Sequence, residues 1–337
     1  MQESNDMWAA SAAGEGESAL KPLVYIDGSE GTTGLQIHQR LAGREDIQLL
    51  RIDEALRKDP AERKRLMNQA DLVFLCLPDD AAREAVTFID NPGTRVIDAS
   101  TAHRVSPGWD YGFAELSPAH RAAIARSKRV ANPGCHATGF ISLVYPLVAA
   151  GVLPKDTPLS CFSLTGYSGG GKKMIAGYEA PDRAALLGSP GIYGIAQGHK
   201  HLPEMQSVCG LTQPPVFSPI VDDYYKGMAT TVPLHMSQLR GVNGLRGLWE
   251  IYRDHYAGQA LVRVALDPTG TEAYSDVGQT LYGAFGAEKD GLTIVVAGND
   301  RQCTVTALFD NLGKGASGAA VQNMNLMLGF PETAGLT

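Results

Sequence analysis

The chain has 337 residues, 44% of them hydrophobic, so it can bury a sizeable core and has the length of one large or two ordinary domains. Its formal net charge of −7 is spread without a Lys/Arg-rich block, which argues against nucleic acid or an anionic membrane as a partner. The five cysteines form no CxxC pair, which argues against a disulfide framework or a zinc site. We therefore expect a cytoplasmic protein that acts on a small molecule and binds no metal.

The N-terminal half alternates short apolar runs with helical patterns. Residues 1–21 lack a basic region and a long apolar run, so they predict a flexible leader. Nearly continuous apolarity, typical of strands buried on both faces, occurs in residues 22–27, 47–52, 71–78, 94–100 and 128–133. Helical patterns lie between them, in residues 33–43, 60–70, 79–90 and 117–127. This alternation predicts a Rossmann-like, doubly wound parallel sheet over residues 22–134.

The sequence changes in character after Gly151. Strands are predicted for residues 159–166, 227–237, 261–266, 292–298 and 302–310, with one clear amphipathic helix at 244–259. We therefore expect a second, α+β catalytic domain over residues 135–312. A final helix is predicted within residues 313–337.

The glycine-rich stretch "DGSEGTTG" directly follows the first predicted strand. Glycines at this point allow a tight turn whose backbone N–H groups bind a pyrophosphate, although a plain strand-to-helix turn has a similar composition. The alternating strands and helices favour the dinucleotide interpretation. After the second strand, Arg51 would pair with a 2′-phosphate and favour NADP, whereas Asp53 would select NAD; either could also be an ordinary exposed charge.

A cysteine stands between a turn and a helix in "ANPGCHATG". Cys135 is predicted at or just before the first helical turn, where free N–H groups and the helix dipole stabilise a thiolate. The alternative is a small buried residue, as expected for Cys76 and Cys161. The preceding turn and the polar residues His136 and Thr138 favour a nucleophile at Cys135.

The stretch "GHKHLPEM" offers a proton carrier for that thiol. His199 and His201 could form a metal pair, but no third ligand has suitable spacing. One imidazole acting as general acid and base, oriented by the other or by Glu204, is more economical. Arg104 in "DASTAHRV" and Ser168 in "TGYSGGGKK" belong to segments that suit an anion-binding nest, although the second could also be a flexible hinge.

Six motifs in order, "DGSEGTTG", "LCLPDDAARE", "DASTAHR", "ANPGCHATG", "TGYSGGGKK" and "GHKHLPEM", closely resemble the N-acetyl-gamma-glutamyl-phosphate reductases of arginine biosynthesis, in their shorter second type. The resemblance covers about residues 23–329 and extends to the wider semialdehyde dehydrogenases. It implies Cys135 as nucleophile and His199, six residues after Tyr193, as active-site histidine. It also implies NADP(H), a C-terminal helix that returns to the nucleotide domain, Asn311 near the nicotinamide, and a homo-oligomer, either a dimer or a tetramer.

The expected reaction begins with attack of Cys135 on an acyl phosphate. The resulting thioester is reduced by NADPH to an aldehyde while His199 moves the protons. Two alternatives stay open: the related reductase of lysine biosynthesis, whose substrate is one methylene longer, and a non-catalytic nucleotide-sensing module. The expected substrate contacts are Arg104, Asn132, Ser168, His201 and Glu204. The expected cofactor contacts are Gly28, Glu30, Gly31, Thr32, Thr33, Gly34, Arg51, Pro78, Ser100 and Asn311.

Overall fold

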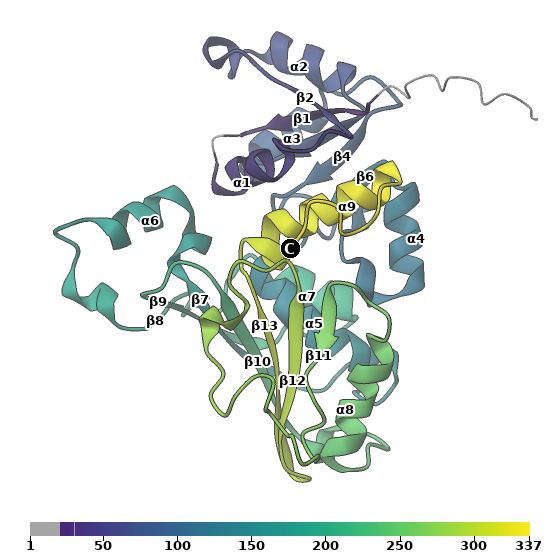
Figure 1. Ribbon diagram of the computed structural model, residues 1–337, viewed down its shortest axis with the longest axis vertical. Coiled ribbons are helices and arrows are strands. Elements are labelled where there is room, and N and C mark those ends of the chain that lie inside the picture. Colours follow the sequence, from purple (N-terminus) through teal and green to yellow (C-terminus); the bar gives the residue numbers. More distant parts are fainter. Residues whose placement is uncertain (1–20, 30) are drawn as a thin grey trace, which may run out of the picture.

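The computed structural model describes residues 21–29 and 31–337, so Glu30 and residues 1–20 of the predicted leader lie outside the described residues. Figure 1 shows sheet A with its helices at the top of the view and the longer strands of sheet B below. The C-terminal helix α9 (Gly318–Leu328) crosses between these two parts of the molecule.

Sheet A is the predicted doubly wound parallel sheet, and it has the strand order β2-β1-β3-β4-β6-β5. Its strands are β1 (Leu23–Asp27), β2 (Gln48–Leu50), β3 (Leu72–Leu75), β4 (Arg95–Asp98), β5 (Asp110–Tyr111) and β6 (Arg129–Ala131). Its helices are α1 (Thr32–Leu41), α2 (Pro60–Gln69), α3 (Asp79–Val86) and α4 (Pro118–Arg126). Each predicted strand is present, and only the two-residue β5 was not predicted from the sequence.

The apolar strand residues alternate between two cores. Tyr25 and Val73 pack with Leu66 of α2 on one face. Val24 and Phe74 belong to the core on the other face, which also contains residues of α1, α4 and α9. Since both faces of the sheet are covered, its strands are nearly continuously apolar.

Sheet B is a mixed sheet with the order β11-β12-β13-β10-β7-β9-β8. Its strands are β7 (Ser160–Gly166), β8 (Gly191–Ile192), β9 (Val216–Asp222), β10 (Met228–His235), β11 (Val262–Val264), β12 (Leu292–Gly298) and β13 (Gln302–Phe309). The helices of this half are α5 (Cys135–Ala149), α6 (Gly171–Glu179), α7 (Leu202–Cys209) and α8 (Gly244–His255). Short 3₁₀ turns are η1 (Glu54–Leu56), η2 (Ala114–Leu116), η3 (Tyr167–Gly170), η4 (Ala185–Gly188), η5 (Met236–Gln238) and η6 (Gly283–Gly286).

Four elements of this half were not predicted from the sequence, namely α6, α7, β8 and β9. The helices α6 and α7 are short, and β9 contains Pro219, which weakens a strand pattern. The loop "TGYSGGGKK" therefore ends in the first turn of a helix, because α6 begins at Gly171. The described part of the chain holds no helix with both the length and the apolarity to cross a membrane.

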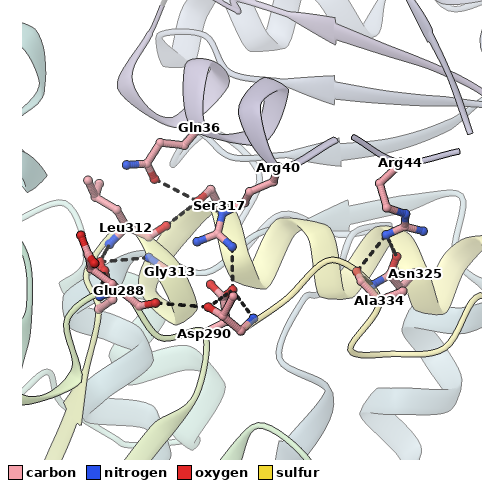
Figure 2. Close-up of polar contacts among 12 residues, drawn as sticks. Gln36, Arg40, Arg44, Glu288, Asp290, Leu312, Gly313, Ser317, Asn325 and Ala334 are labelled. Atoms are coloured by element: carbon pink, nitrogen blue, oxygen red, sulfur yellow. Dashed lines mark hydrogen bonds and ion pairs between the residues drawn. The ribbon is translucent and has the colours of Figure 1, made fainter. Parts of the chain in front are cut away.

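The C-terminal segment connects the two halves through partly buried polar contacts (Figure 2). It begins as a π-helical turn, η7 (Gly313–Ser317), and continues into α9. Arg40 of α1 forms an ion pair of 2.6 Å with the fully buried Asp290 and donates to Ser317 Oγ at 3.0 Å. Arg44 donates to Asn325 Oδ1 at 3.0 Å. The helix that follows the glycine loop is thereby bonded to the half built on sheet B and to the C-terminal segment.

Candidate active site

A cavity of about 330 Å³ lies where the carboxyl ends of sheet A meet sheet B and the C-terminal segment. Ala99 and Asn132 follow β4 and β6, Thr165 belongs to β7, and Asn311 precedes the π-helical turn. Carboxyl ends of parallel strands are where open α/β sheets bind ligands. The predicted site residues that line this cavity are Thr33, Arg104, Asn132, Cys135, His199, His201 and Asn311.

Cys135 is the first residue of α5, as predicted, with Gly134 as the N-cap. The expected lowering of its pKa is not found. Burial raises the pKa of the thiol, although the backbone N–H of His136 and the charges of Arg104 and Lys200 act in the opposite direction. The resting thiol is therefore protonated at neutral pH.

The π-helical turn passes directly beside Cys135. A Cβ atom placed on Gly315 would stand 2.9 Å from the Cβ of Cys135, so a larger residue would displace one of the two segments. Single π-helical turns often occur at functional sites. Asn311 and Leu312, just before this turn, line the same cavity.

The turn before Cys135 is held by a buried ion pair. Glu204, only 1% exposed, lies 2.7 Å from Arg104 Nη1 and accepts hydrogen bonds from Gly134 N–H at 3.2 Å and Tyr111 O–H at 2.8 Å. Arg104 Nε donates to the carbonyl of Asn132 at 3.0 Å. These contacts fix the turn that precedes Cys135, and Arg104 also lines the cavity.

The two histidines of "GHKH" line the same cavity, with ring centroids 4.7 Å apart. Burial, followed by the charges of Lys200 and Arg104, lowers the pKa of His199 to about 4, so its imidazole is neutral at pH 7. The N–H of His201 donates to His199 Nδ1 at 3.2 Å and holds that ring. His201 itself is buried beside Glu204, at 4.0 Å, and burial lowers its pKa well below the usual range.

Four further polar side chains line the cavity but were not assigned from the sequence: Lys200, Tyr193, His136 and Thr165. Lys200 lies between the two histidines, so its position in the motif was a usable signal. Tyr193 and His136 are hydrogen-bonded to each other across 57 residues of sequence, at 2.6 Å. No local pattern could have revealed that contact.

The glycine loop has the geometry needed to bind a pyrophosphate. Gly28 has a φ of +87°, and a Cβ atom on it would stand 2.4 Å from the carbonyl oxygen of Cys76. A Cβ on Gly34 would stand 2.4 Å from the carbonyl oxygen of Gly28. Gly31 is the N-cap of α1, so the free N–H groups of that helix are available to an anion. A dinucleotide fits this loop.

A second hollow of about 240 Å³ connects the glycine loop with the reaction cavity, because Thr33, Ala99, Gly169 and Leu312 line both. Its lining residues are Gly31, Thr32, Thr33, Cys76, Leu77, Ala99, Ser168, Gly169, Gly171 and Leu312. Ser168, expected at the substrate, thus lies on the nucleotide side. Its Oγ accepts from Asn311 Nδ2 at 3.0 Å, and Asn311 Oδ1 accepts from Gly227 N–H at 2.8 Å.

Two predicted cofactor residues have local structural roles. The hydroxyl of Ser100 donates to Asp98 at 2.8 Å, and Pro78 is the N-cap of α3. Asn132, expected at the substrate, donates through Nδ2 to the carbonyl of Ala316 at 2.9 Å, which joins the nucleophile turn to the C-terminal segment.

Cationic side chains line two hollows beside β1 and the glycine loop. Arg51 lines a hollow of about 170 Å³ beside β2. Arg57 and Lys58 line a neighbouring hollow of about 380 Å³ that also contains Gly28 of the glycine loop. Asp53, the alternative ribose ligand, instead caps η1 by accepting from Ala55 N–H at 2.9 Å.

Comparison with known proteins places the chain in a class. The model of the semialdehyde dehydrogenase NAD binding domain matches residues 23–124, and that of the semialdehyde dehydrogenase dimerisation domain matches residues 135–311. Aspartate semialdehyde dehydrogenase II of Vibrio cholerae, solved with ASA, has the same fold with a TM-score of 0.69 and 16% identity, covering 92% of this chain and 99% of that one. The nucleotide-binding sheet, the cysteine and the second domain define a semialdehyde dehydrogenase.

The sequence relatives narrow this class to one family. The chain is 48% identical to N-acetyl-gamma-glutamyl-phosphate reductase 2 of Pseudomonas putida, over 93% of this chain and 99% of that protein. It is 47% identical to N-acetyl-gamma-glutamyl-phosphate reductase of Brucella anthropi, over 92% and 99%. The chain belongs to the N-acetyl-gamma-glutamyl-phosphate reductase family, which confirms the resemblance seen in its motifs.

Proposed function

We propose that this chain reduces N-acetyl-glutamyl 5-phosphate to N-acetyl-glutamate 5-semialdehyde with NADPH and releases phosphate, in arginine biosynthesis. The observation that carries the proposal is the position of Cys135. It stands at the first turn of α5, in a cavity that contains His199 and is joined to the glycine-loop hollow. The names of the relatives support an acyl phosphate as the substrate. No observation favours the lysine-pathway enzyme or a sensing module over this reaction.

The first step is the attack of Cys135 on the acyl carbon. The neutral imidazole of His199 takes the thiol proton, because burial keeps the thiol protonated until a base removes it. The new C–S bond forms while the C–O bond to phosphate breaks, which leaves a thioester on Cys135. Lys200 and the N-terminus of α5 stabilise the negative charge of the phosphate.

The second step reduces the thioester. NADPH, when bound, supplies the hydride. His199 returns its proton to the former carbonyl oxygen, and removal of that proton then lets the C–S bond break, which releases the aldehyde and frees Cys135. Thr33 and Asn311 line the reaction cavity on the nucleotide side and hold the cofactor near the sulfur.

The preference for NADPH is supported by the adenosine end of the site. Arg51, Arg57 and Lys58 provide positive charge for a 2′-phosphate, and the carboxylate of Asp53 is engaged in capping η1. The five cysteines are free thiols, which fits the proposed cytoplasmic location.

The proposed assembly is a dimer or a tetramer of this chain. The match to a dimerisation domain supports self-association. Leu186 and Ile195, which precede and follow β8 in the sequence, are 83% and 81% exposed. The segment from α6 to β8 extends sideways from sheet B in Figure 1. Large apolar side chains exposed together mark association surfaces. Light scattering of the purified chain tests this, and a monomer at assay concentrations would contradict it.

One assay tests the reaction. Purified protein is given NADP, phosphate and N-acetyl-glutamate semialdehyde, and NADPH formation is followed with and without phosphate. We expect phosphate-dependent turnover that is faster than with the homologue one methylene longer. Faster turnover of the homologue would favour the lysine-pathway enzyme, and absence of any NADP chemistry would favour a sensing module.

A further inference from the structure

His136, the residue after the nucleophile, has both ring nitrogens bonded to other side chains. It is only 2% exposed. Its Nδ1 lies 2.8 Å from Ser163 Oγ, and its Nε2 lies 2.6 Å from the hydroxyl of Tyr193. A buried imidazole with two such short contacts has a fixed orientation, because any rotation would leave a polar atom without a partner.

On the side of Ser163, this hydrogen-bond network is anchored in two paired strands of sheet B. Ser163 on β7 is the register partner of Thr230 on β10, and their hydroxyl oxygens are 2.8 Å apart. Helix α5 lies close to this pair, because a Cβ atom on Gly139 would stand 2.3 Å from Thr230 Oγ1. The position of His136 is therefore set by the central strands of sheet B rather than by a loop.

Tyr193 is the end of the network that reaches the reaction cavity. It follows the two-residue strand β8 and lines the cavity together with Cys135. Burial, followed by the nearby thiol of Cys135, raises the pKa of Tyr193, so its hydroxyl keeps its proton throughout the working range. Burial also lowers the pKa of His136 to about 3, so the imidazole between Ser163 and Tyr193 is neutral.

We propose that His136 is a positioning residue that holds the Tyr193 hydroxyl as a hydrogen-bond donor to the acyl oxygen of the substrate bound to Cys135. In this arrangement Ser163 donates to Nδ1 and the Nε2–H donates to the phenol oxygen. The phenol proton is thereby left for the substrate. Negative charge develops on the acyl oxygen during both attack and reduction, so a fixed donor acts most strongly in the transition state. The inference rests on the proposed reductase activity.

The test compares four variants in the phosphate-dependent assay. Tyr193→Phe and His136→Phe should each lower kcat about 10- to 100-fold, the effect of one lost hydrogen bond to a charged oxygen, with KM changed less than threefold. The double variant should be no slower than either single one, since both changes remove the same donor. His136→Gln, whose amide can reach the phenol, should recover most of the rate.

Thr231→Val is the matched control. Thr231 stands next to Thr230 on β10 and also bonds a buried hydroxyl, that of Thr306 at 2.9 Å, without lining the cavity. It should keep wild-type kcat. Multiplicative losses in the double variant, no recovery in His136→Gln, or equal slowing in Thr231→Val would overturn the inference. An inactive wild-type enzyme would instead reject the proposed function.

Discussion

Cys135 lies under two opposing electrostatic effects. Burial and the charge of Glu204 disfavour its thiolate, whereas the first turn of α5, Arg104 and Lys200 favour it. Together, these effects raise the pKa of the Cys135 thiol. The proposed chemistry therefore requires a base, and His199, whose pKa of about 4 leaves its imidazole neutral at pH 7, can accept the proton.

The pH dependence of alkylation tests the state of the thiol. Because the pKa of Cys135 is raised, the thiolate is scarce at pH 7 and increases as pH rises through a value above the usual 8.5 or so. The rate of iodoacetamide labelling, followed by peptide mapping, should rise through pH 9 without a plateau. Cys135→Ser should remove this label and abolish turnover while NADPH still binds. A plateau below pH 8 would contradict the raised pKa.

Substitution of His199 and substitution of His201 should change different kinetic parameters. His199→Asn keeps a polar side chain of similar size but cannot carry a proton, so kcat should fall about 10²- to 10⁴-fold. His201→Asn should act mainly on KM, because His201 is packed against Gly134 and Glu204. Steady-state kinetics of both variants measure this. If His201→Asn were the inactive one, the roles of the two residues would have to be exchanged.

At the scale of elements, we propose that the segment between β2 and α2 sets the preference for NADPH over NADH. It brings Arg51, Arg57 and Lys58 to two neighbouring hollows beside the glycine loop, and Asp53 Oδ1 caps η1 by accepting from Ala55 N–H. The helix N-terminus binds phosphate without distinguishing the two cofactors, so discrimination depends on these cations.

Removal of these cations should narrow the preference for NADPH over NADH. We expect Arg57→Ala and Lys58→Ala each to reduce the ratio of kcat/KM for the two cofactors about tenfold, the value of one charge-assisted contact. Arg51→Ala tests the third cation. Arg65→Ala is the control, because Arg65 is an exposed residue of α2 that pairs with Glu62. An unchanged ratio in all three variants would place the 2′-phosphate elsewhere.

At the scale of the whole molecule, the C-terminal segment joins nucleotide binding to catalysis. Asp290, fully buried, receives Arg40 of α1 at 2.6 Å and the backbone N–H of Thr337 at 3.0 Å (Figure 2). The same segment carries Gly315 past Cys135. The contacts of α1 and the close approach to Cys135 therefore belong to the same C-terminal segment.

Loss of the ion pair between Arg40 and Asp290 should lower the free energy of unfolding and weaken the binding of NADPH. Arg40→Ala leaves the buried Asp290 without its cation. Such a loss lowers the free energy of unfolding by about 3–5 kcal/mol when both partners are buried. Because Arg40 is partly exposed, we expect a loss of about 2 kcal/mol. Denaturant unfolding and NADPH titration measure the two effects. Arg246→Ala, which breaks the two ion pairs of an exposed arginine with Glu250 and Asp267, should cost about 1 kcal/mol or less. Equal effects of the two variants would contradict a special role for the ion pair between Arg40 and Asp290.

The sequence by itself determined the parallel sheet, the glycine loop and the position of Cys135. Apolar runs such as residues 71–78 and the turn "NPG" act on their immediate neighbours, so their structure can be predicted from local rules. The resemblance in six motifs also predicted the family that the comparisons confirm. The short helix α7 and the proline-containing strand β9 were missed because their local signals are weak.

The tertiary structure alone decided how the site is held together. Glu204 meets Arg104 across 100 residues and Tyr193 meets His136 across 57 residues, so neither pair leaves a periodic trace in the sequence. The pKa of Cys135 was likewise decided by the fold. The helix terminus that favours the thiolate is a local feature, whereas the burial that outweighs it depends on the chain segments that close over the cavity.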